Sequence, residues 1–158
     1  MILGNSTEVK SLVELRALAV KFLDGIAKNE ANKGATVVCM SGDLGAGKTA
    51  FVKCVASVLG ITDVVTSPTF VLEKIYTIPA GSVVGTRFSK LIHIDAYRLR
   101  SGKETSALGF DEIIADKNNI VFIEWPENIH DALPKEVINL SFSYVDGNVR
   151  RVEERISR

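Results

Sequence analysis

A glycine-rich stretch in the first third of the chain has the residue types and the spacing to hold a phosphate group. Its residues match the pattern G-x-x-x-x-G-K-[ST] at every fixed position; they are Gly42, Asp43, Leu44, Gly45, Ala46, Gly47, Lys48 and Thr49, with Ala50 directly after them. Glycines allow positive φ and close approach of the backbone, so that successive N–H groups point into one concavity. The lysine of such a loop reaches the terminal phosphates, and the final hydroxyl ligates Mg²⁺. The pattern predicts a site for a nucleotide and its magnesium ion.

The segments on both sides of this loop are the ones that a phosphate site needs. Residues 35–40 form a short, continuous apolar run, which is typical of a strand buried on both faces. Residues 49–59 carry their apolar side chains on one helical stripe, and Gly60 then favours a stop. A strand, a loop and a helix in this order aim the helix N-terminus at the anion. These flanks disfavour the alternative of a glycine-rich turn without a ligand.

Two acidic residues stand where a metal-binding carboxylate is expected. Asp95 ends the predicted strand 91–94, and Glu124 ends the predicted strand 120–123. In a parallel sheet both side chains emerge at the carboxyl edge, where nucleotide crevices lie. If both lie near the ion, one attends Mg²⁺ and the other positions or activates the attacking water, and the sequence leaves both assignments open. The alternative for either residue alone is a helix cap or a surface acid.

Thr69 lies in a bent segment, Ser-Pro-Thr-Phe at 67–70, between the loop helix and Asp95. We expect it to contact the γ-phosphate as a nucleotide-sensing switch, the alternative being an ordinary threonine at a strand edge.

The only indication of which base the nucleotide carries is a motif that the sequence lacks. GTPases of the Ras type carry Asn-Lys-x-Asp, which the Asp-Lys-Asn-Asn at 116–119 does not match, so ATP is the preferred nucleotide.

Composition limits the size and the partners of the protein. With 158 residues, 46% of them hydrophobic, residues 1–158 are expected to form a single domain. The formal net charge is zero and no Lys/Arg run stands out, so DNA is not an expected partner and tRNA is expected only indirectly, through a protein. No apolar stretch is long enough for a membrane span and the N-terminus lacks a signal pattern, which favours the cytoplasm. Cys39 and Cys54 are interpreted as buried, reduced thiols.

The remaining elements are predicted from periodicity and turn residues. A first helix is expected at about 8–27, although Asn5 with Glu8 and Ser11 with Glu14 both resemble capping boxes. The other expectations are a β-rich segment at 64–76 that Pro68 interrupts, an excursion at 77–90, short helices near 104–108 and 111–116, and a β-hairpin of 137–144 with 149–156. The fold class is therefore α/β, with a three-layer architecture like that of P-loop NTPases, a central, mainly parallel sheet and a C-terminal antiparallel hairpin.

These residues together resemble the bacterial TsaE (YjeE) family of P-loop ATPases, which serves the synthesis of N6-threonylcarbamoyladenosine (t6A) in tRNA. The matching motifs in chain order are the phosphate loop with its Asp-Leu pair at 43–44, Ser-Pro-Thr-Phe at 67–70, His-Ile-Asp-Ala-Tyr-Arg-Leu at 93–99, Ile-Glu-Trp-Pro-Glu at 123–127 and Leu-Pro at 133–134. The resemblance covers essentially the whole chain. It implies an ATPase that is slow alone and acts with partners similar to TsaB and TsaD.

The resemblance also implies roles for individual residues. Lys48, Thr69, Asp95 and Glu124 would form the catalytic set, with Thr49 and Glu124 attending Mg²⁺ and Asp95 acting as the Walker-B-like acid. Trp125 would lie beside the nucleotide. Ser11 is nearest to the place where the family carries a threonine close to the adenine. Tyr97 and Arg98 are equally well explained as structural residues.

Two other functions are compatible with a phosphate loop. A small-molecule P-loop kinase would need a lid arginine and an acceptor pocket; the sequence has no lid-like basic cluster, although Arg98 and Arg100 keep this alternative open. The other alternative is a non-catalytic switch that binds ATP only to hold partners together.

Overall fold

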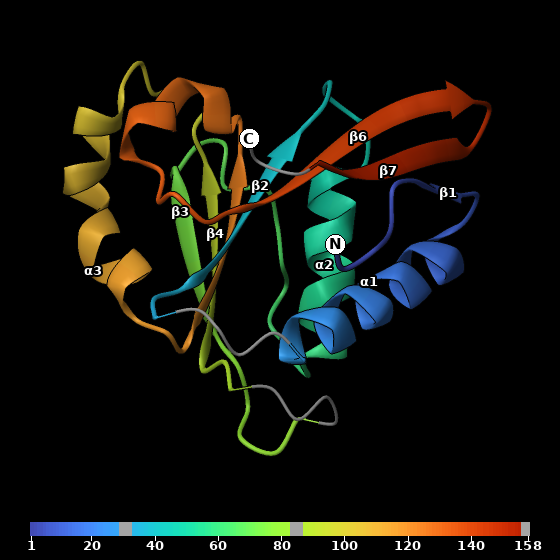
Figure 1. Ribbon diagram of the computed structural model, residues 1–158, viewed down its shortest axis with the longest axis horizontal. Coiled ribbons are helices and arrows are strands. Elements are labelled where there is room, and N and C mark those ends of the chain that lie inside the picture. Colours follow the sequence, from blue (N-terminus) through green and yellow to red (C-terminus); the bar gives the residue numbers. More distant parts are fainter. Residues whose placement is uncertain (29–32, 83–86, 156–158) are drawn as a thin grey trace.

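The sheet that carries the site is mixed, with a parallel centre (Figure 1). The computed structural model describes residues 1–28, 33–82 and 87–155, and within them seven strands pair in the order β1-β7-β6-β2-β5-β4-β3. The four neighbouring strands β6, β2, β5 and β4 run parallel, and the outer pairings are antiparallel. The strands are β1 (Thr7–Val9), β2 (Thr36–Ser41), β3 (Glu73–Thr77), β4 (Lys90–Asp95), β5 (Asn119–Glu124), β6 (Ile138–Asp146) and β7 (Val149–Arg155).

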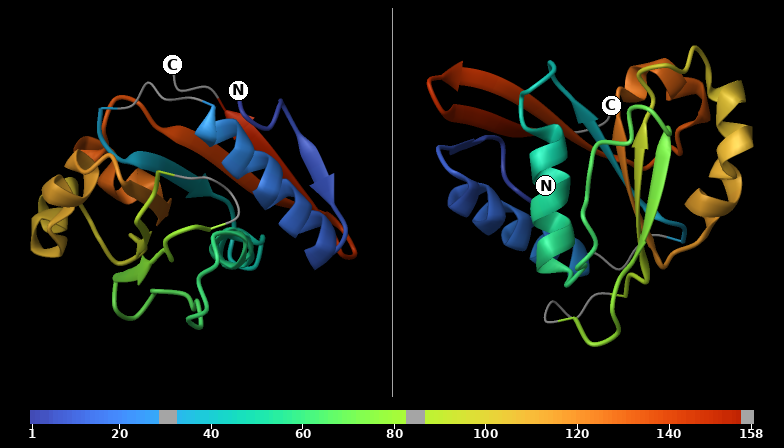
Figure 2. Two further views of the ribbon diagram at one scale, coloured as in Figure 1. Left: turned by 90° about the horizontal axis from the view of Figure 1, so that it is seen from below. Right: turned by 180° about the vertical axis from the view of Figure 1, so that it is seen from behind.

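Helices cover both faces of this sheet, which gives the predicted three layers (Figures 1 and 2). The helices are α1 (Leu12–Ala27), α2 (Lys48–Val58), the 3₁₀ segments η1 (Gly102–Leu108) and η2 (Pro126–Ala132), and α3 (Phe110–Ala115). The buried strand β2 separates the two cores by simple alternation: Val38 and Met40 face α1 and α2, and Val37 and Cys39 face η1, α3 and η2. The α/β class, the parallel centre and the C-terminal hairpin are all as predicted.

The first helix begins later than predicted. Residues 7–9 form β1, which pairs antiparallel with β7, and α1 starts at Leu12. Of the two capping candidates, Ser11 is the cap: its Oγ accepts a hydrogen bond from Glu14 N at 3.2 Å, while a Glu14 carboxylate oxygen accepts one from Lys10 N at 2.6 Å. Pairing with β7 satisfies the backbone of residues 7–9 and buries Val9, which the local pattern does not reveal. Leu12, the first residue of α1, is 71% exposed.

The β-rich segment predicted at 64–76 is mostly not a strand. Only its end belongs to β3, and the carbonyl of Pro68 instead accepts hydrogen bonds from Val71 N and Leu72 N, which closes a turn. Leu72 then adopts φ 66°, a left-handed conformation that does not occur in a regular strand. β3 and β4 pair antiparallel, as a hairpin excursion requires, but residues 83–86 of the connection lie outside the described residues.

The other predicted elements agree with the structure. Gly109, at φ 65°, separates η1 from α3. β6 and β7 form the C-terminal hairpin, and only residue 156 of its predicted range lies outside the described residues. Within the described ranges, no helix has the length and apolar character needed to cross a membrane.

Candidate nucleotide site

The glycine loop joins β2 to α2, as the pattern predicts. Gly42 has φ 137°, and a Cβ at this position would lie 2.2 Å from the carbonyl oxygen of Phe142. Only glycine fits there, because β6 runs directly beside the loop. Gly47 caps α2 at φ 110° without a side-chain hydrogen bond. The first N–H groups of α2 are therefore available to a ligand at the loop.

Lys48 is a buried cation held by its own loop. It is 4% exposed, and its ammonium donates hydrogen bonds to the carbonyl oxygens of Gly42 at 2.5 Å and Asp43 at 2.9 Å. Its Nζ also lies 5.3 Å from the centre of the Trp125 ring. Among the residues that the structure describes, no carboxylate lies within 4.0 Å of this ammonium. A buried lysine that makes no close ion pair suits a phosphate group.

The two predicted acids lie side by side at the carboxyl edge of the sheet. β4 and β5 are parallel, and their register pairs Asp95 with Glu124. Both are buried. Glu124 Oε1 accepts a hydrogen bond from Thr49 Oγ1 at 2.9 Å, and Asp95 Oδ2 accepts one from Thr69 Oγ1 at 2.7 Å. Each predicted acid is thus linked to a different predicted hydroxyl.

The environment of Glu124 favours its charged form. Burial alone would raise the pKa of this carboxyl group, but contact with His93, the hydrogen bond from Thr49 and the nearby Lys48 ammonium together lower it. Glu124 is accordingly ionised at neutral pH and acts only as a hydrogen-bond acceptor.

The segment around Thr69 is positioned by polar contacts and partly exposed. Thr69 Oγ1 lies 2.7 Å from Ser67 Oγ as well as contacting Asp95, and the second carboxylate oxygen of Asp95 accepts from Tyr97 N at 2.9 Å. Phe70 is 83% exposed, and the guanidinium of Arg98 lies 5.2 Å from the centre of its ring. In the described structure Arg98 thus packs on the bent segment.

A cavity of about 710 Å³ gathers the predicted catalytic residues. It lies along the loop and the first turns of α2, between these and the bent segment. Its lining includes Lys48, Thr49, Lys53, Thr66, Ser67, Thr69, Asp95, Tyr97, Glu124 and Trp125. Its volume is within the range of small-molecule sites, and its polar groups converge as such sites require.

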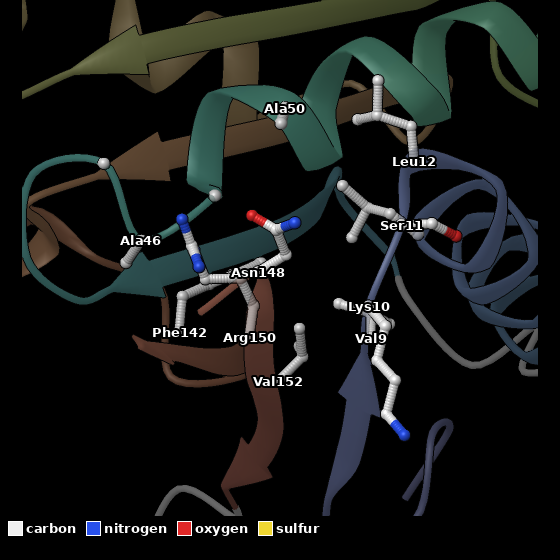
Figure 3. Close-up of a pocket in the computed structure, with 13 residues that line it drawn as sticks. Val9, Lys10, Ser11, Leu12, Ala46, Ala50, Phe142, Asn148, Arg150 and Val152 are labelled. Carbon is white, nitrogen blue, oxygen red and sulfur yellow. The ribbon is translucent and has the colours of Figure 1, made fainter. Parts of the chain in front are cut away.

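A second cavity, of about 390 Å³, lies against another side of the loop (Figure 3). Gly45, Gly47 and Ala50 line both cavities. In Figure 3 the side chains of Asn148 and Arg150, from the end of the β6–β7 hairpin, lie across from Ser11 at the start of α1. Ser11 and Trp125, the two predicted contacts outside the loop, therefore line different cavities.

Sequence reasoning missed three of these residues. Asn148 and Arg150 reach the loop only because β6 pairs parallel with β2, which the local pattern of a hairpin does not reveal. His93 carried a signal, since it lies two residues before Asp95 and so faces the same side of β4. Its Nε2 lies 2.9 Å from Glu124 Oε1.

The parallel centre of the sheet and a glycine loop that joins a strand to a helix define a P-loop fold of the α/β class. Comparison with known proteins then identifies the family. The model of the family described as threonylcarbamoyl adenosine biosynthesis protein TsaE matches residues 9–152, and the chain belongs to this family. The predicted family is thereby confirmed.

Individual relatives agree with this assignment. The tRNA threonylcarbamoyladenosine biosynthesis protein TsaE of Rickettsia felis is 33% identical over 151 residues, which cover 95% of this chain and 75% of that protein. The protein of the same name from Bacillus subtilis is 32% identical over 148 residues, covering 94% and 79%. The crystal structure of Bacillus subtilis YdiB superimposes with a TM-score of 0.68 at 28% identity, covering 94% of this chain and 82% of that one.

Proposed function

We propose that the protein binds ATP with Mg²⁺, hydrolyses it slowly alone, and serves an assembly that makes t6A in tRNA. One observation carries the proposal: a buried lysine, with no carboxylate within 4.0 Å in the described part of the chain, and two hydroxyl–carboxylate pairs line a single cavity beside the glycine loop. Membership of the TsaE family supports the link to tRNA modification.

The proposed roles follow from the contacts. Lys48 and the N–H groups of the loop hold the β- and γ-phosphates. Thr49 and Glu124 attend Mg²⁺, since a hydroxyl and an ionised carboxylate joined by a hydrogen bond are the oxygen donors that this ion prefers. The ion, when bound, neutralises charge that builds up on the phosphate oxygens. Asp95, held by Thr69, orients the attacking water.

We assign the nucleoside to the second cavity. This cavity shares Gly45, Gly47 and Ala50 with the first, so a ligand with its phosphates over the loop can extend into it. Ser11, Asn148 and Arg150 supply polar groups at its wall. ATP, and ADP after hydrolysis, remain the expected nucleotides.

Proteins similar to TsaB and TsaD are the proposed partners, with tRNA contacted only through them in the cytoplasm. Apolar side chains near the first cavity support a protein contact there: Leu44, which lines it, is 94% exposed, and Phe70 and Tyr97 are also exposed. Exposed apolar side chains around a functional site are typical of interaction surfaces.

The direct test is the variant Lys48→Ala, with Lys103→Ala as the control because Lys103 is an exposed lysine of η1. Calorimetry is expected to detect ATP binding by the control but not by Lys48→Ala. The same variant should fail to support repeated cycles of tRNA modification with the partner proteins. Normal turnover by Lys48→Ala would contradict the proposal.

Two further measurements separate the alternatives. Release of the γ-phosphate, followed with and without the partner proteins, distinguishes an ATPase from a switch that only binds ATP. Radiolabelled phosphate that appears on a metabolite would instead identify a kinase. Finally, t6A in cellular tRNA should fall when the protein is depleted, and an unchanged level would contradict the assigned pathway.

A further inference from the structure

His93 is a buried polar side chain to which the proposed function gives no role. It lies in β4 and is 0% exposed. Its Nε2 is 2.9 Å from Glu124 Oε1, the same oxygen that accepts a hydrogen bond from the Thr49 hydroxyl. Its Nδ1 is buried and has no hydrogen-bond partner in the described part of the chain. The ring therefore has its polar contact on one side only, and that contact is Glu124.

The chemistry of the two groups decides which ring nitrogen carries a hydrogen. An ionised carboxylate offers only lone pairs, so Nε2 must be the donor. With its hydrogen on Nδ1 alone, the ring would set a nitrogen lone pair against the carboxylate oxygen and bury an N–H group without an acceptor. Both effects are unfavourable.

We propose that His93 is a positioning residue that fixes the carboxylate of Glu124 for Mg²⁺. His93 holds Oε1 from β4, and Thr49 holds the same oxygen from α2. Glutamate has several rotatable bonds, and two donors on one oxygen restrict them while leaving the second oxygen for the metal. This inference rests on the proposed function, in which Glu124 attends the ion.

Two variants with the same amide group test the proposal. In His93→Gln the side-chain amide nitrogen reaches about as far as Nε2, whereas in His93→Asn it reaches only about as far as Nδ1. Calorimetry of ADP binding over a range of Mg²⁺ concentrations provides the readout. We expect the Mg²⁺ concentration for half-maximal effect to rise about 10- to 100-fold in His93→Asn. In His93→Gln this Mg²⁺ concentration should stay within about threefold of that of the unmodified protein. The affinity for ADP without Mg²⁺ should be similar in the unmodified protein and in both variants.

A merely structural role predicts a different pattern, in which both variants lose thermal stability but keep the same Mg²⁺ requirement. An unaltered Mg²⁺ requirement in His93→Asn, or equal impairment of the two variants, would overturn the proposal. Nitrogen NMR of the unmodified protein gives an answer even if a variant fails to fold: a hydrogen on Nε2 is expected, and a hydrogen on Nδ1 alone overturns the proposal. If ADP binding by the unmodified protein ignores Mg²⁺, the metal part of the proposed function fails instead, and the NMR result still decides the contact.

Discussion

Thr49 Oγ1 donates a hydrogen bond of 2.9 Å to Glu124 Oε1 and so joins the first turn of α2 to the end of β5, although the two residues are 75 positions apart in the chain. The hydroxyl hydrogen is used by the carboxylate, which leaves the oxygen lone pairs of Thr49 for a metal ion. Asp95 has its own hydroxyl partner in Thr69. The two acids are therefore equivalent in their place on the sheet but different in their contacts.

Thr49→Val should weaken Mg²⁺-dependent nucleotide binding, whereas Thr49→Ser should preserve it. Valine removes the hydroxyl and leaves a buried carboxylate oxygen with one donor fewer; hydrogen bonds to charged groups contribute about 1.5–3 kcal/mol. We expect affinity for ADP with Mg²⁺ to fall by roughly 10- to 100-fold, as measured by calorimetry. Equal affinities of the valine and serine variants would contradict the role of the hydroxyl.

Thr69→Val should slow hydrolysis without loss of ATP binding. The substitution removes the donor that holds Asp95, and misplacement of a group that orients the attacking water typically costs about 100-fold in rate. Thr69→Ser retains a hydroxyl and is the matched control. Single-turnover γ-phosphate release measures the rate and calorimetry measures the binding. A Thr69→Val protein that hydrolyses ATP at the unmodified rate would make Thr69 an ordinary threonine at the site.

Trp125 should report nucleotide binding through its fluorescence. It is the only tryptophan in the sequence, and the Lys48 ammonium lies 5.3 Å from its ring centre. A phosphate that attracts this ammonium changes the field at the indole, so the emission should change on addition of ATP. The variant Trp125→Phe serves as the blank. If calorimetry shows that ATP binding is saturated and the emission is still unchanged, the prediction is wrong, and the Lys48 ammonium does not move relative to the Trp125 ring.

Cys39 should resist thiol reagents as long as the protein is folded. Burial raises the pKa of the Cys39 thiol to about 12, and Glu127 adds to the rise. A raised thiol pKa depletes the reactive thiolate, which at pH 8 is roughly one molecule in ten thousand. In the variant Cys54→Ala, Cys39 is the only thiol. Its reaction with a chromogenic disulfide, followed by absorbance, should occur only when the protein unfolds. Reaction of this folded variant at the rate of a free thiol would contradict the predicted burial.

Local pattern was sufficient for the elements that build the loop. β2 and α2 were predictable because a buried strand and an amphipathic helix differ in period, and glycines separate them. The closeness of Asp95 and Glu124 followed from two apolar strands that each end in an acid, once the sheet was taken as parallel. Their different hydroxyl partners depend on side-chain geometry, which no spacing in the sequence specifies.

Elements that depend on distant pairing were the ones that the sequence did not reveal. β1 forms because residues 7–9 pair with the exposed edge of β7. The local pattern of these three residues is equally compatible with the start of a helix. Asn148 and Arg150 reach the second cavity because β6 lies next to β2. In the bent segment, the turn at Pro68 outweighs the β-propensity of its neighbours.

Within the described part of the chain, the two residues other than glycine that have positive φ both lie next to the acids. Trp125, at φ 58°, follows Glu124 directly, and Leu72, at φ 66°, accepts a hydrogen bond from Asp95 N at 2.9 Å. Each such left-handed backbone conformation lowers the stability of the folded protein by about 1 kcal/mol or more, and asparagine at the same position would reduce this cost. Efforts to make the protein more heat-resistant would therefore select changes at these two positions first. The gain in melting temperature would come from changes directly beside the two acids in the chain or in the hydrogen-bond pattern, so thermal stability and turnover are expected to oppose each other here.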